Sequence, residues 1–320
     1  MAQRPAAVAV VVTWNRRDLL TKSLTAVLAQ TSPPETVVVV DNASDDGTSQ
    51  MVAERFPAVD LVTAARNTGG AGGFAVGLAR ALRRPGDAVW LMDDDTVPEP
   101  GALAALLDAR ARYPGRTPAL VASRVVWTDG RDHPMNTPRR RPFAGADAAG
   151  RAAGVGCIPI RSASFVSILV DAARARSVGL PVADYFLWND DFEYTTRLLR
   201  GAVGLYCPAS VAVHRTEKFG ASDADPGGRL YYEVRNKVWL FTRSRSLSPV
   251  EKVVYGGSTV RRWVRTVARS APRTAALRQV GRGLVGGLRR PPRRTEDVVA
   301  EILGAQAVDE ATAATEDRRG

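Results

Sequence analysis

The sequence predicts an α/β fold with a mostly parallel sheet, helices on both of its faces and a basic helical extension at the C-terminal end. In the first half, short apolar runs alternate with segments of helical periodicity, and each apolar run is continuous. Continuous apolar runs are typical of parallel strands that are buried on both faces. In addition, polar clusters directly follow these runs, where ligands bind in such sheets.

The elements follow in order along the chain. We expect strands at residues 8–12, 36–40, 59–63 and 88–92, each a short apolar run. Helices are expected around the apolar stripe that includes Leu20, Leu24 and Leu28, and at 48–55, 73–82 and 99–112. In the second half we expect strands at 119–127, 164–170, 203–206 and 211–213, and helices at 190–200 and 229–242. Residues 129–156 lack periodicity and are expected to form a long loop over a site.

The positive charge is concentrated near the C-terminal end. The chain has 320 residues and a net charge of +11, but residues 234–294 contain sixteen basic residues and one acidic residue. This segment therefore carries +15 and the remainder −4. Such a segment favours a polyanionic neighbour, which is a membrane surface, a lipid diphosphate or a nucleic acid.

Within this segment, apolar residues such as Val260, Trp263, Val264 and Val267 recur at helical spacing, with arginines between them. A basic amphipathic helix of this kind is typical of proteins that lie on anionic membranes. The alternative is a helix packed on the body of the protein with solvated arginines. Residues 305–320 are small and polar and are expected to fray.

The compartment is expected to be the cytoplasm. The N-terminal residues show no signal-peptide pattern, and no apolar stretch reaches the roughly 20 residues of a spanning helix. Cys157 and Cys207 lack a metal-ligand spacing and are expected to be reduced thiols in the core.

The most informative motif is the acidic triplet Asp93, Asp94 and Asp95 at the end of the expected strand 88–92. Three adjacent carboxylates repel one another, so a cation must balance them. A divalent metal with oxygen ligands is the natural candidate. A solvated acidic turn is the alternative for this triplet taken alone.

Three further clusters follow the other strands. They contain Thr13 and Asn15, then Asp41, then Asn67 with Gly69 and Gly70. Asp41 is suited to accept from a base or a ribose hydroxyl, and the glycines allow a ligand to approach the backbone closely. Each cluster has a structural alternative, because Asn and Asp also cap helices and turns. Their joint placement at one sheet edge is the argument for a binding site.

A second acidic cluster contains Asp190, Asp191 and Glu193 beside Trp188. Carboxylates in the first turn of a helix are favoured by its dipole, but a carboxylate beside an aromatic wall also suits a general base that faces a sugar hydroxyl. His214 ends an extended piece and is either a third metal ligand or a surface histidine. Arg235, and Lys237 near it, are candidates to face a diphosphate.

These motifs, taken in order, resemble a known family. The segments are TWNR, VVVDNASDDGT, RNTGGAGG, WLMDDDT, WNDDFEY, VAVH and YYEVRN. Together they resemble the family 2 inverting glycosyltransferases with a GT-A fold, and in particular the galactofuranosyltransferases and rhamnosyltransferases of bacterial cell-wall polysaccharide synthesis. The resemblance runs from about residue 8 to residue 240.

The resemblance implies roles for single residues. Thr13, Asn15 and Asp41 would hold the base and ribose of a nucleoside diphosphate sugar. Asn67 and the glycines would line the donor, and Asp93 and Asp94 would lie beside it. Mn²⁺ or Mg²⁺ would be bound by Asp93, Asp95 and His214. Asp191 matches the catalytic base, with Asp190 as the alternative one residue away, and Trp188, Glu193 and Arg235 would face the acceptor or a diphosphate.

The expected function is therefore transfer of galactofuranose from UDP-galactofuranose to a polyprenyl-diphosphate-linked glycan, at the cytoplasmic face of the plasma membrane. Transfer of rhamnose from dTDP-rhamnose is the alternative. A sugar-nucleotide pyrophosphorylase would need a Gly-rich basic loop after the first strand, where TWNR stands. A non-catalytic basic protein that binds membranes or nucleic acid is a further alternative, but no nucleic-acid recognition motif is present.

We expect a catalytic domain at residues 1–240, with a nucleotide-sugar half (about 1–127) and an acceptor half (about 157–240). The basic extension would span residues 241–304.

Overall fold

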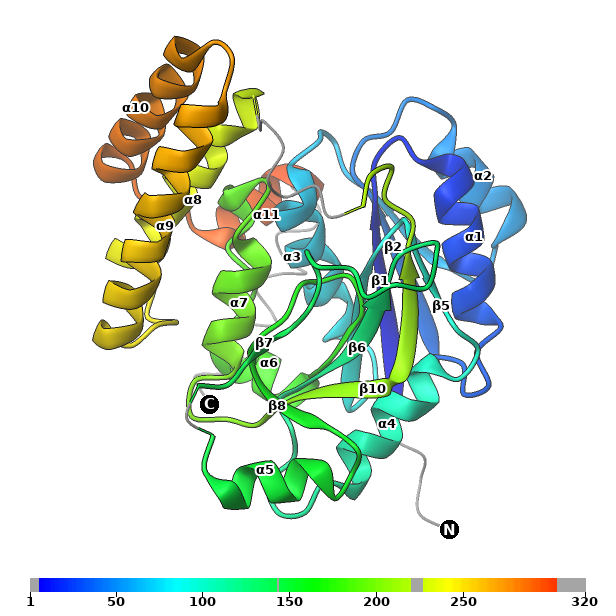
Figure 1. Cartoon of the computed structure of the whole chain (residues 1–320). Coiled ribbons are helices and arrows are strands. Elements are labelled where there is room, and N and C mark those ends of the chain that lie inside the picture. Colours follow the sequence, from blue (N-terminus) through cyan, green and yellow to red (C-terminus); the bar gives the residue numbers. More distant parts are fainter. Residues whose placement is uncertain (1–5, 143, 220–226, 304–320) are drawn as a thin grey trace, which may run out of the picture.

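The computed structural model describes residues 6–142, 144–219 and 227–303. In this part of the chain one sheet of ten strands has the order β3-β2-β1-β4-β9-β6-β10-β8-β7, with β5 paired to β10 (Figure 1). The strands are β1 (Ala7–Thr13), β2 (Thr36–Asp41), β3 (Asp60–Thr63), β4 (Ala88–Asp93), β5 (Thr96–Pro98), β6 (Leu120–Val126), β7 (Arg139–Arg140), β8 (Ile158–Ser162), β9 (Ile168–Asp171) and β10 (Gly204–His214).

The first four strands are parallel, as the sequence predicts. The register places Thr13 beside Asp41 and Val12 beside Asp93, so the loops after β1, β2 and β4 leave from one edge of the sheet. Beyond β4 the sheet is mixed, because β9 is antiparallel to both of its neighbours. The end of β10 runs antiparallel to β5, which pairs His214 with Thr96 directly after the acidic triplet.

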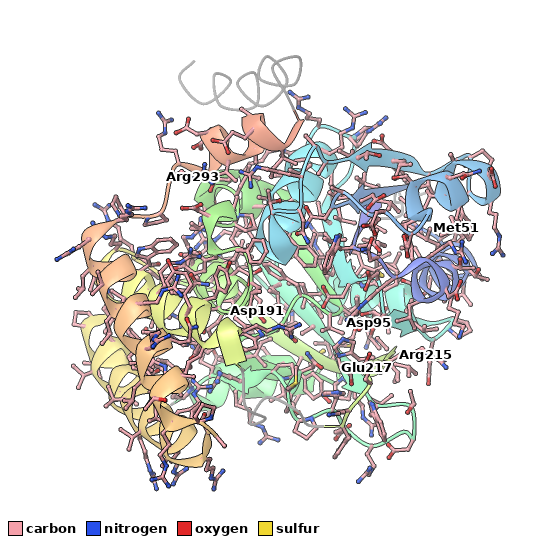
Figure 2. The ribbon with its side chains drawn as sticks, turned by 90° about the horizontal axis from the view of Figure 1, so that it is seen from above. Met51, Asp95, Asp191, Arg215, Glu217 and Arg293 are labelled. Atoms are coloured by element: carbon pink, nitrogen blue, oxygen red, sulfur yellow. The ribbon has the colours of Figure 1, made fainter. Side chains whose placement is uncertain are left out.

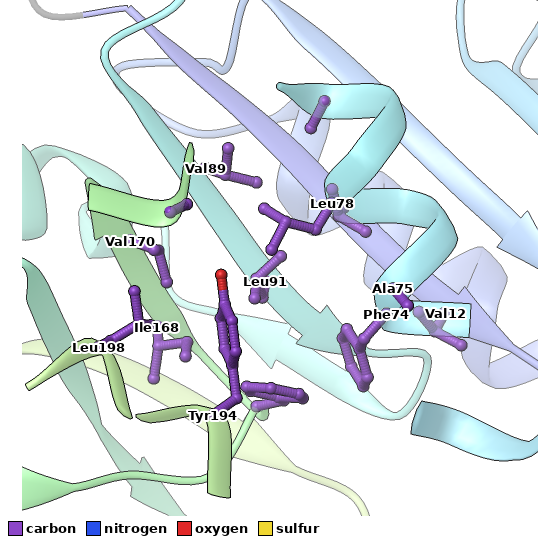
Figure 3. Close-up of a cluster of buried hydrophobic side chains, with 14 of the residues drawn as sticks. Val12, Phe74, Ala75, Leu78, Val89, Leu91, Ile168, Val170, Tyr194 and Leu198 are labelled. Atoms are coloured by element: carbon purple, nitrogen blue, oxygen red, sulfur yellow. The ribbon is translucent and has the colours of Figure 1, made fainter. Parts of the chain in front are cut away.

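Helices cover both faces of the sheet. On one face, α1 (Arg17–Leu28), α2 (Thr48–Arg55) and α4 (Ala102–Arg112) pack on alternate residues of the strands, among them Val11 and Trp90. The other face is covered by α3 (Gly69–Ala81), α6 (Ala172–Val178) and α7 (Asp190–Leu198). Figure 3 shows this second layer, with Phe74 and Leu78 of α3 facing Val12, Leu91 and Tyr194.

The glycines after Asn67 lie inside α3 rather than in a loop before it, which corrects the predicted helix start at residue 73. A β-carbon on Gly73 would come within 2.4 Å of Val12, and one on Gly77 within 2.4 Å of Val10. Gly73 and Gly77 therefore allow α3 to lie directly on β1, whereas the predicted ligand access concerns Gly69 and Gly70 at the start of the helix.

Residues 129–156 contain more structure than the predicted loop. They include β7 and α5 (Ala146–Ala153), and Asp132 forms a bridge with Val126. The two short strands predicted at 203–206 and 211–213 are one strand, β10, whose register shifts between Cys207 and Val211. The strand predicted at 164–170 begins only at Ile168, and β8 precedes it.

The segment predicted as the basic extension, residues 241–304, forms helices that pack in two different places. The helices α9 (Pro249–Arg269) and α10 (Arg273–Arg289) pack with α8 (Leu230–Thr242) through Val234, Trp263 and Ala276. By contrast, α11 (Thr295–Leu303) returns to the body and buries Val298, Val299 and Ile302 in the core beneath α3. The sequence predicts the residues of α11 as part of the basic extension, because a run of arginines directly precedes them.

None of the described helices has the length and apolar composition to span a bilayer. Cys157 and Cys207 are both buried and free, as predicted. The residues predicted to fray, 305–320, lie outside the described part of the chain.

Candidate active site

The acidic triplet and the end of β10 meet at the sheet edge. Asp93 is the last residue of β4, Asp95 follows in the turn to β5, and His214 ends β10. One ligand atom from each of these three residues lies within 4.8 Å of the other two. The sequence predicts the same three residues as metal ligands, and the pairing of β5 with β10 brings the histidine to the carboxylates.

Asp94 has a different environment from its neighbours. Its carboxylate accepts from Thr13 Oγ1 at 2.8 Å and from the Trp14 amide at 3.3 Å. These contacts join the end of β4 to the end of β1. Thr13, predicted to contact a nucleotide, therefore holds the acidic turn in place in this structure.

Within the protein, the side chain of Arg16 supplies positive charge beside the acidic triplet. Its guanidinium lies 2.6 Å from Asp95 Oδ2 and 3.3 Å from Asp94 Oδ1. Burial raises the pKa of Asp94 to about 6, against the charge of Arg16. Burial and the charge of Asp95 raise the pKa of Asp93 to about 7. One half-exposed arginine thus leaves the pKa values of Asp93 and Asp94 raised, although it helps to lower that of Asp95.

Asp95 and His214 form the buried part of the cluster. Asp95 Oδ1 lies 2.9 Å from His214 Nε2, yet this buried oxygen has no partner of hydrogen-bond geometry among the described residues. Burial lowers the pKa of His214, but the contact with Asp95 outweighs burial and raises it. The other ring nitrogen, Nδ1, contacts Asn136 Oδ1 at 2.8 Å, which fixes the ring orientation.

This donor set fits a divalent cation. Two carboxylates and one imidazole are oxygen and nitrogen ligands of the kind that Mn²⁺ accepts, and one of the carboxylate oxygens is buried without a hydrogen bond. Asp93, Asp95 and His214 are the residues that would hold the metal. Asn136 would orient the histidine through the ring nitrogen that does not face the metal, Nδ1, as outer-shell partners do in metal sites.

The predicted donor loops are linked to each other. Asn15, in the left-handed region at φ 52°, donates to Asp45 Oδ1 at 2.8 Å and accepts from the Asp45 amide. Asp41 is fully buried and accepts from the Ser44 amide and from Ser49 Oγ. These contacts shape the turn after β2. They also mean that Asp41 has structural partners in addition to any nucleotide contact.

Two asparagines organise the third loop. Asn67 Oδ1 accepts from the Gly69 amide at 2.7 Å. Asn42, which has no predicted role, donates to the Gly69 carbonyl at 2.7 Å and accepts from the Thr68 amide at 2.9 Å. Gly69 has a φ of +70°, and a β-carbon there would come within 1.9 Å of the Phe186 carbonyl oxygen. Gly70, by contrast, has open space around its α-carbon.

The second acidic cluster begins α7, after a strained loop. Phe186, Trp188 and Asn189 all have positive φ values between 64° and 67°. Asn236 Nδ2 holds this loop by donating at 2.9 Å to three backbone carbonyls, of Tyr185, Leu187 and Trp188. A strained loop that is held from outside is common at functional sites.

Arg235 takes part in the same clamp. Its guanidinium donates to the carbonyls of Asp184 and Tyr185 at 2.9 Å and lies 4.2 Å from the ring centroid of Trp239. Its contacts in the structure hold the loop, and its predicted contact with a diphosphate stays a prediction. The charge of Lys237, two residues along α8, opposes the rise in the pKa of Asp191.

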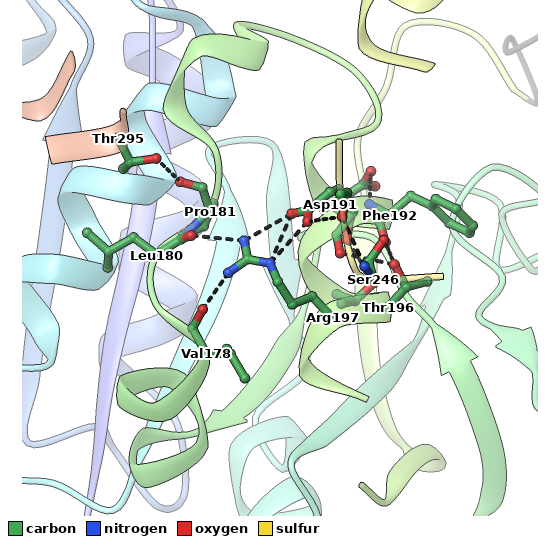
Figure 4. A network of polar contacts seen from close by, with 12 residues as sticks. Val178, Leu180, Pro181, Asp191, Phe192, Thr196, Arg197, Ser246 and Thr295 are labelled. Atoms are coloured by element: carbon green, nitrogen blue, oxygen red, sulfur yellow. Dashed lines mark hydrogen bonds and ion pairs between the residues drawn. The ribbon is translucent and has the colours of Figure 1, made fainter. Parts of the chain in front are cut away.

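Glu193 and Trp188 differ in exposure. Glu193 is buried, pairs with Arg197 at 3.0 Å and accepts from Ser244 Oγ at 2.7 Å. Arg197 in turn donates to the carbonyls of Val178 and Leu180 (Figure 4), so the pair of Glu193 and Arg197 connects α7 to the end of α6 and the segment after it. Trp188 keeps 38% of its surface exposed and is free to contact a ligand.

The two aspartates at the start of α7 have different electrostatic environments. Burial raises the pKa of Asp190 well above its usual range, and the charges of Asp191 and Asp93 raise it further. Burial also raises the pKa of Asp191, but Lys237 and Arg139 oppose the shift. The charge of Asp93 thus contributes to the raised pKa of Asp190, whereas two cations oppose the rise in the pKa of Asp191. Figure 2 shows Asp191 and Asp95 on the same side of the molecule.

The chain is similar to several known proteins in sequence and in fold. Residues 8–161 match the family described as Glycosyl transferase family 2. Galactofuranosyltransferase GlfT1 of Mycobacterium tuberculosis is 30% identical over 297 residues, which cover 86% of this chain and 94% of that protein. An N-acetylglucosaminyl-diphospho-decaprenol L-rhamnosyltransferase of the same species is 25% identical over 261 residues, covering 69% of this chain and 79% of the relative.

Among solved structures, GalNAc-T7 with UDP, GalNAc and Mn²⁺ is similar with a TM-score of 0.54 at 14% identity. The match covers 78% of this chain, and the chain spans about half of that protein, 52%. This likeness concerns the fold, which is the GT-A arrangement of a mixed sheet with flanking helices.

Proposed function

Because the chain belongs to glycosyl transferase family 2, we propose that it transfers galactofuranose from UDP-galactofuranose to a lipid-linked glycan. The chain is a glycosyltransferase, which excludes the alternative of a non-catalytic basic protein. The observation that carries the proposal is the placement of Asp93, Asp95 and His214 together at the sheet edge. The choice of sugar follows the relative with the higher identity.

The donor would lie along the ends of β1, β2 and β4. Asp41, Asn15 and Thr13 would face the base and ribose, and Asn67, Gly69 and Gly70 would border the sugar nucleotide. Asp93 and Asp94 would border the diphosphate side. Mn²⁺ or Mg²⁺ bound by Asp93, Asp95 and His214 would neutralise the diphosphate as a leaving group. The Mn²⁺ and UDP of GalNAc-T7 support this choice of cofactor and donor class.

Asp191 would act as the general base. Its carboxylate would accept the proton of the acceptor hydroxyl as that oxygen attacks the anomeric carbon from the face opposite the diphosphate. The configuration would therefore invert in one displacement. Asp190, beside Asp93, remains the alternative base.

The acceptor would be a glycan on a polyprenyl diphosphate at the cytoplasmic face of the plasma membrane. The rhamnosyltransferase relative has a diphospho-decaprenol substrate in its name, which supports this substrate class. The outer surfaces of α9 and α10 are also suited to an anionic bilayer. Large apolar side chains are exposed there beside arginines, namely Val250, Val253, Val254, Val260 and Val264 on α9, and Leu277, Leu284, Val285 and Leu288 on α10.

Rhamnose transfer from dTDP-rhamnose is the second candidate, because a rhamnosyltransferase also matches the chain. The test is a transfer assay with Mn²⁺ in which UDP-galactofuranose and dTDP-rhamnose compete for short-chain prenyl-diphosphate acceptors that carry N-acetylglucosamine, with and without an added rhamnose. We expect a product enlarged by galactofuranose, with an inverted anomeric centre by NMR. Addition of rhamnose instead would favour the second candidate, and no product from either donor would contradict the proposed activity.

The same assay identifies the base. Asp191→Asn is expected to reduce kcat by roughly 10²- to 10⁴-fold while leaving the donor KM near its wild-type value. Asp190→Asn is the matched variant one residue away. If Asp190→Asn loses transfer and Asp191→Asn keeps it, the roles of the two residues are reversed.

A further inference from the structure

A second polar site lies beside α7, away from the strand ends. It is a pocket of about 740 Å³ between β7, α7, α8 and α9. Its walls include six basic side chains and two aromatic ones, which are Arg139, Lys237, Arg261, Arg262, Arg265, Arg269, Phe192 and Tyr255. Phe192 directly follows the proposed base, Asp191, along α7, and the pocket's Lys237 and Arg139 act on the pKa of Asp191.

The positive charge of the pocket is poorly balanced. Arg262 lies 3.9 Å from Glu233, and Glu233 also accepts from Asn189 at 2.7 Å. Within the described residues, no ion pair joins a carboxylate to Arg139, Arg261, Arg265 or Arg269. Like charges gathered around a cavity raise the local concentration of anions. The pocket therefore has the electrostatics of a site for a polyanion.

Lys237 marks the inner end of the pocket. Only 6% of its surface is exposed, and its ammonium lies 4.7 Å from the ring centroid of Phe192. Burial lowers the pKa of Lys237 to about 8, against the attraction of Glu233. No hydrogen bond or ion pair to Lys237 is found in the described part of the chain. A bound anion would provide the partner that a buried ammonium requires.

Hydrogen bonds, an ion pair and ring contacts fix the residues that form the walls of the pocket. The helix α9 begins with a capping box formed by Ser248 and Glu251. Glu251 also pairs with Arg161 of β8 at 2.7 Å, and Arg161 donates to the carbonyls of Thr196 and Ser246. At the other wall, Phe192 and Tyr255 pack edge to face with centroids 5.3 Å apart, and the Arg139 guanidinium lies 5.4 Å from the Phe192 ring.

The residues of the pocket differ from those proposed to hold the donor diphosphate. The proposed metal ligands are Asp93, Asp95 and His214, and none of them lines the pocket. Two of the pocket's cations, Lys237 and Arg139, oppose the rise in the pKa of Asp191. Under the proposed function, Asp191 would activate a hydroxyl of an acceptor held in this pocket.

From this arrangement we propose that the arginine pocket binds the diphosphate of the lipid-linked acceptor. The inference rests on the proposed function and assigns the pocket as the acceptor diphosphate site. Arg261 and Arg265, one turn apart on α9, form the charged wall, and Lys237 lies at the inner end. The distance from this wall to Asp191 would then select acceptors by the number of sugars between the diphosphate and the attacking hydroxyl.

The test is the binding of geranyl diphosphate in EDTA, where the metal-dependent donor site does not contribute. Isothermal titration compares the wild type with Arg261→Gln/Arg265→Gln. The matched control is Arg278→Gln/Arg289→Gln, which removes the same charge from exposed positions of α10. We expect the pocket variant to bind at least tenfold more weakly and the control to bind like the wild type. Equal binding by all three proteins would overturn the inference.

A second arm distinguishes the two sources of phosphate. Flotation with vesicles of phosphatidylglycerol and phosphatidylcholine measures binding to lipid headgroups. If the pocket variant loses vesicle binding but keeps geranyl diphosphate, the pocket serves headgroups and the inference is wrong. If it loses geranyl diphosphate and keeps vesicle binding, the inference holds.

Transfer kinetics separate this inference from the proposed function. The pocket variant should raise KM for a diphosphate-linked acceptor and leave KM unchanged for the same glycan on an octyl group. Equal effects on both acceptors would overturn the inference even where the enzyme is active. Failure of the wild type to glycosylate either acceptor, with geranyl diphosphate binding intact, would instead contradict the proposed function.

Discussion

Asn136 contacts His214 Nδ1 at 2.8 Å through its side-chain oxygen, and this contact joins an irregular segment to the proposed metal site. Asn136 is itself held by Ser164, which accepts from its amide at 3.0 Å. The ring of His214 is thereby turned so that Nε2 faces Asp95. The segment before β7 thus contributes a residue that orients a ligand of the proposed metal site.

We expect Asn136→Ala to weaken Mn²⁺ binding by about 10- to 100-fold, because outer-shell partners have effects of this size. Titration of the metal, followed by electron paramagnetic resonance, measures it. Asn42→Ala is a useful comparison, since Asn42 supports the donor loop and does not contact His214. Unchanged Mn²⁺ affinity in Asn136→Ala would mean that the asparagine does not orient the histidine.

The pH dependence of kcat should report the environment of Asp191. Burial raises its pKa, and the charge of Lys237 opposes the shift. A base must be ionised, so activity is lost as the pH falls through this pKa. Lys237→Met removes the opposing charge, so the acid limb of the profile should move to higher pH.

Lys252→Met is the control for this experiment, because Lys252 donates to the Ser244 carbonyl and does not line the pocket. An acid limb that stays in place in Lys237→Met, measured at saturating acceptor, would contradict the assignment of Asp191 as the base.

The stability of the catalytic body should depend on α11. Ile302 is fully buried among residues of the core layer that includes Val298 and Phe74. Ile302→Ala is expected to lower the free energy of unfolding by about 2–5 kcal/mol, measured by urea denaturation. The exposed Val250→Ala change should have a much smaller effect. Equal stability of the two variants would show that α11 is not part of the cooperative unit.

Membrane binding is tested with point changes, because truncation before α10 would also remove α11 from the core. Val253→Glu/Val264→Glu places two acids on exposed positions of α9. We expect at least a tenfold loss of partition onto anionic vesicles, with the thermal midpoint retained, since neither side chain is buried. Vesicle binding that persists after both changes would place the membrane contact elsewhere.

The sequence predicts the first half of the fold well, because its strands are continuous apolar runs and its acidic triplet directly follows one of them. It also places His214 at a strand end, but it does not indicate that β5 pairs with β10. That pairing is a tertiary contact between residues more than a hundred positions apart.

Other features have no local signal. Asn42, Asn136 and Asn236 act through backbone carbonyls and distant side chains, which a single asparagine in a sequence does not reveal. The glycines of α3 show the converse problem. The glycine cluster after Asn67 predicts ligand access to the backbone, but it does not reveal that Gly73 and Gly77 allow the close approach of the helix to β1.

The central claim is that Asp93, Asp95 and His214 bind a nucleoside diphosphate sugar through a divalent metal. The most direct test is the thermal stability of the wild type and Asp95→Ala with UDP, dTDP and their sugars, each with Mn²⁺ or with EDTA. We predict stabilisation by one nucleotide that requires Mn²⁺ and is absent from the folded variant. Stabilisation that is the same in EDTA, or that persists in Asp95→Ala, would contradict the claim.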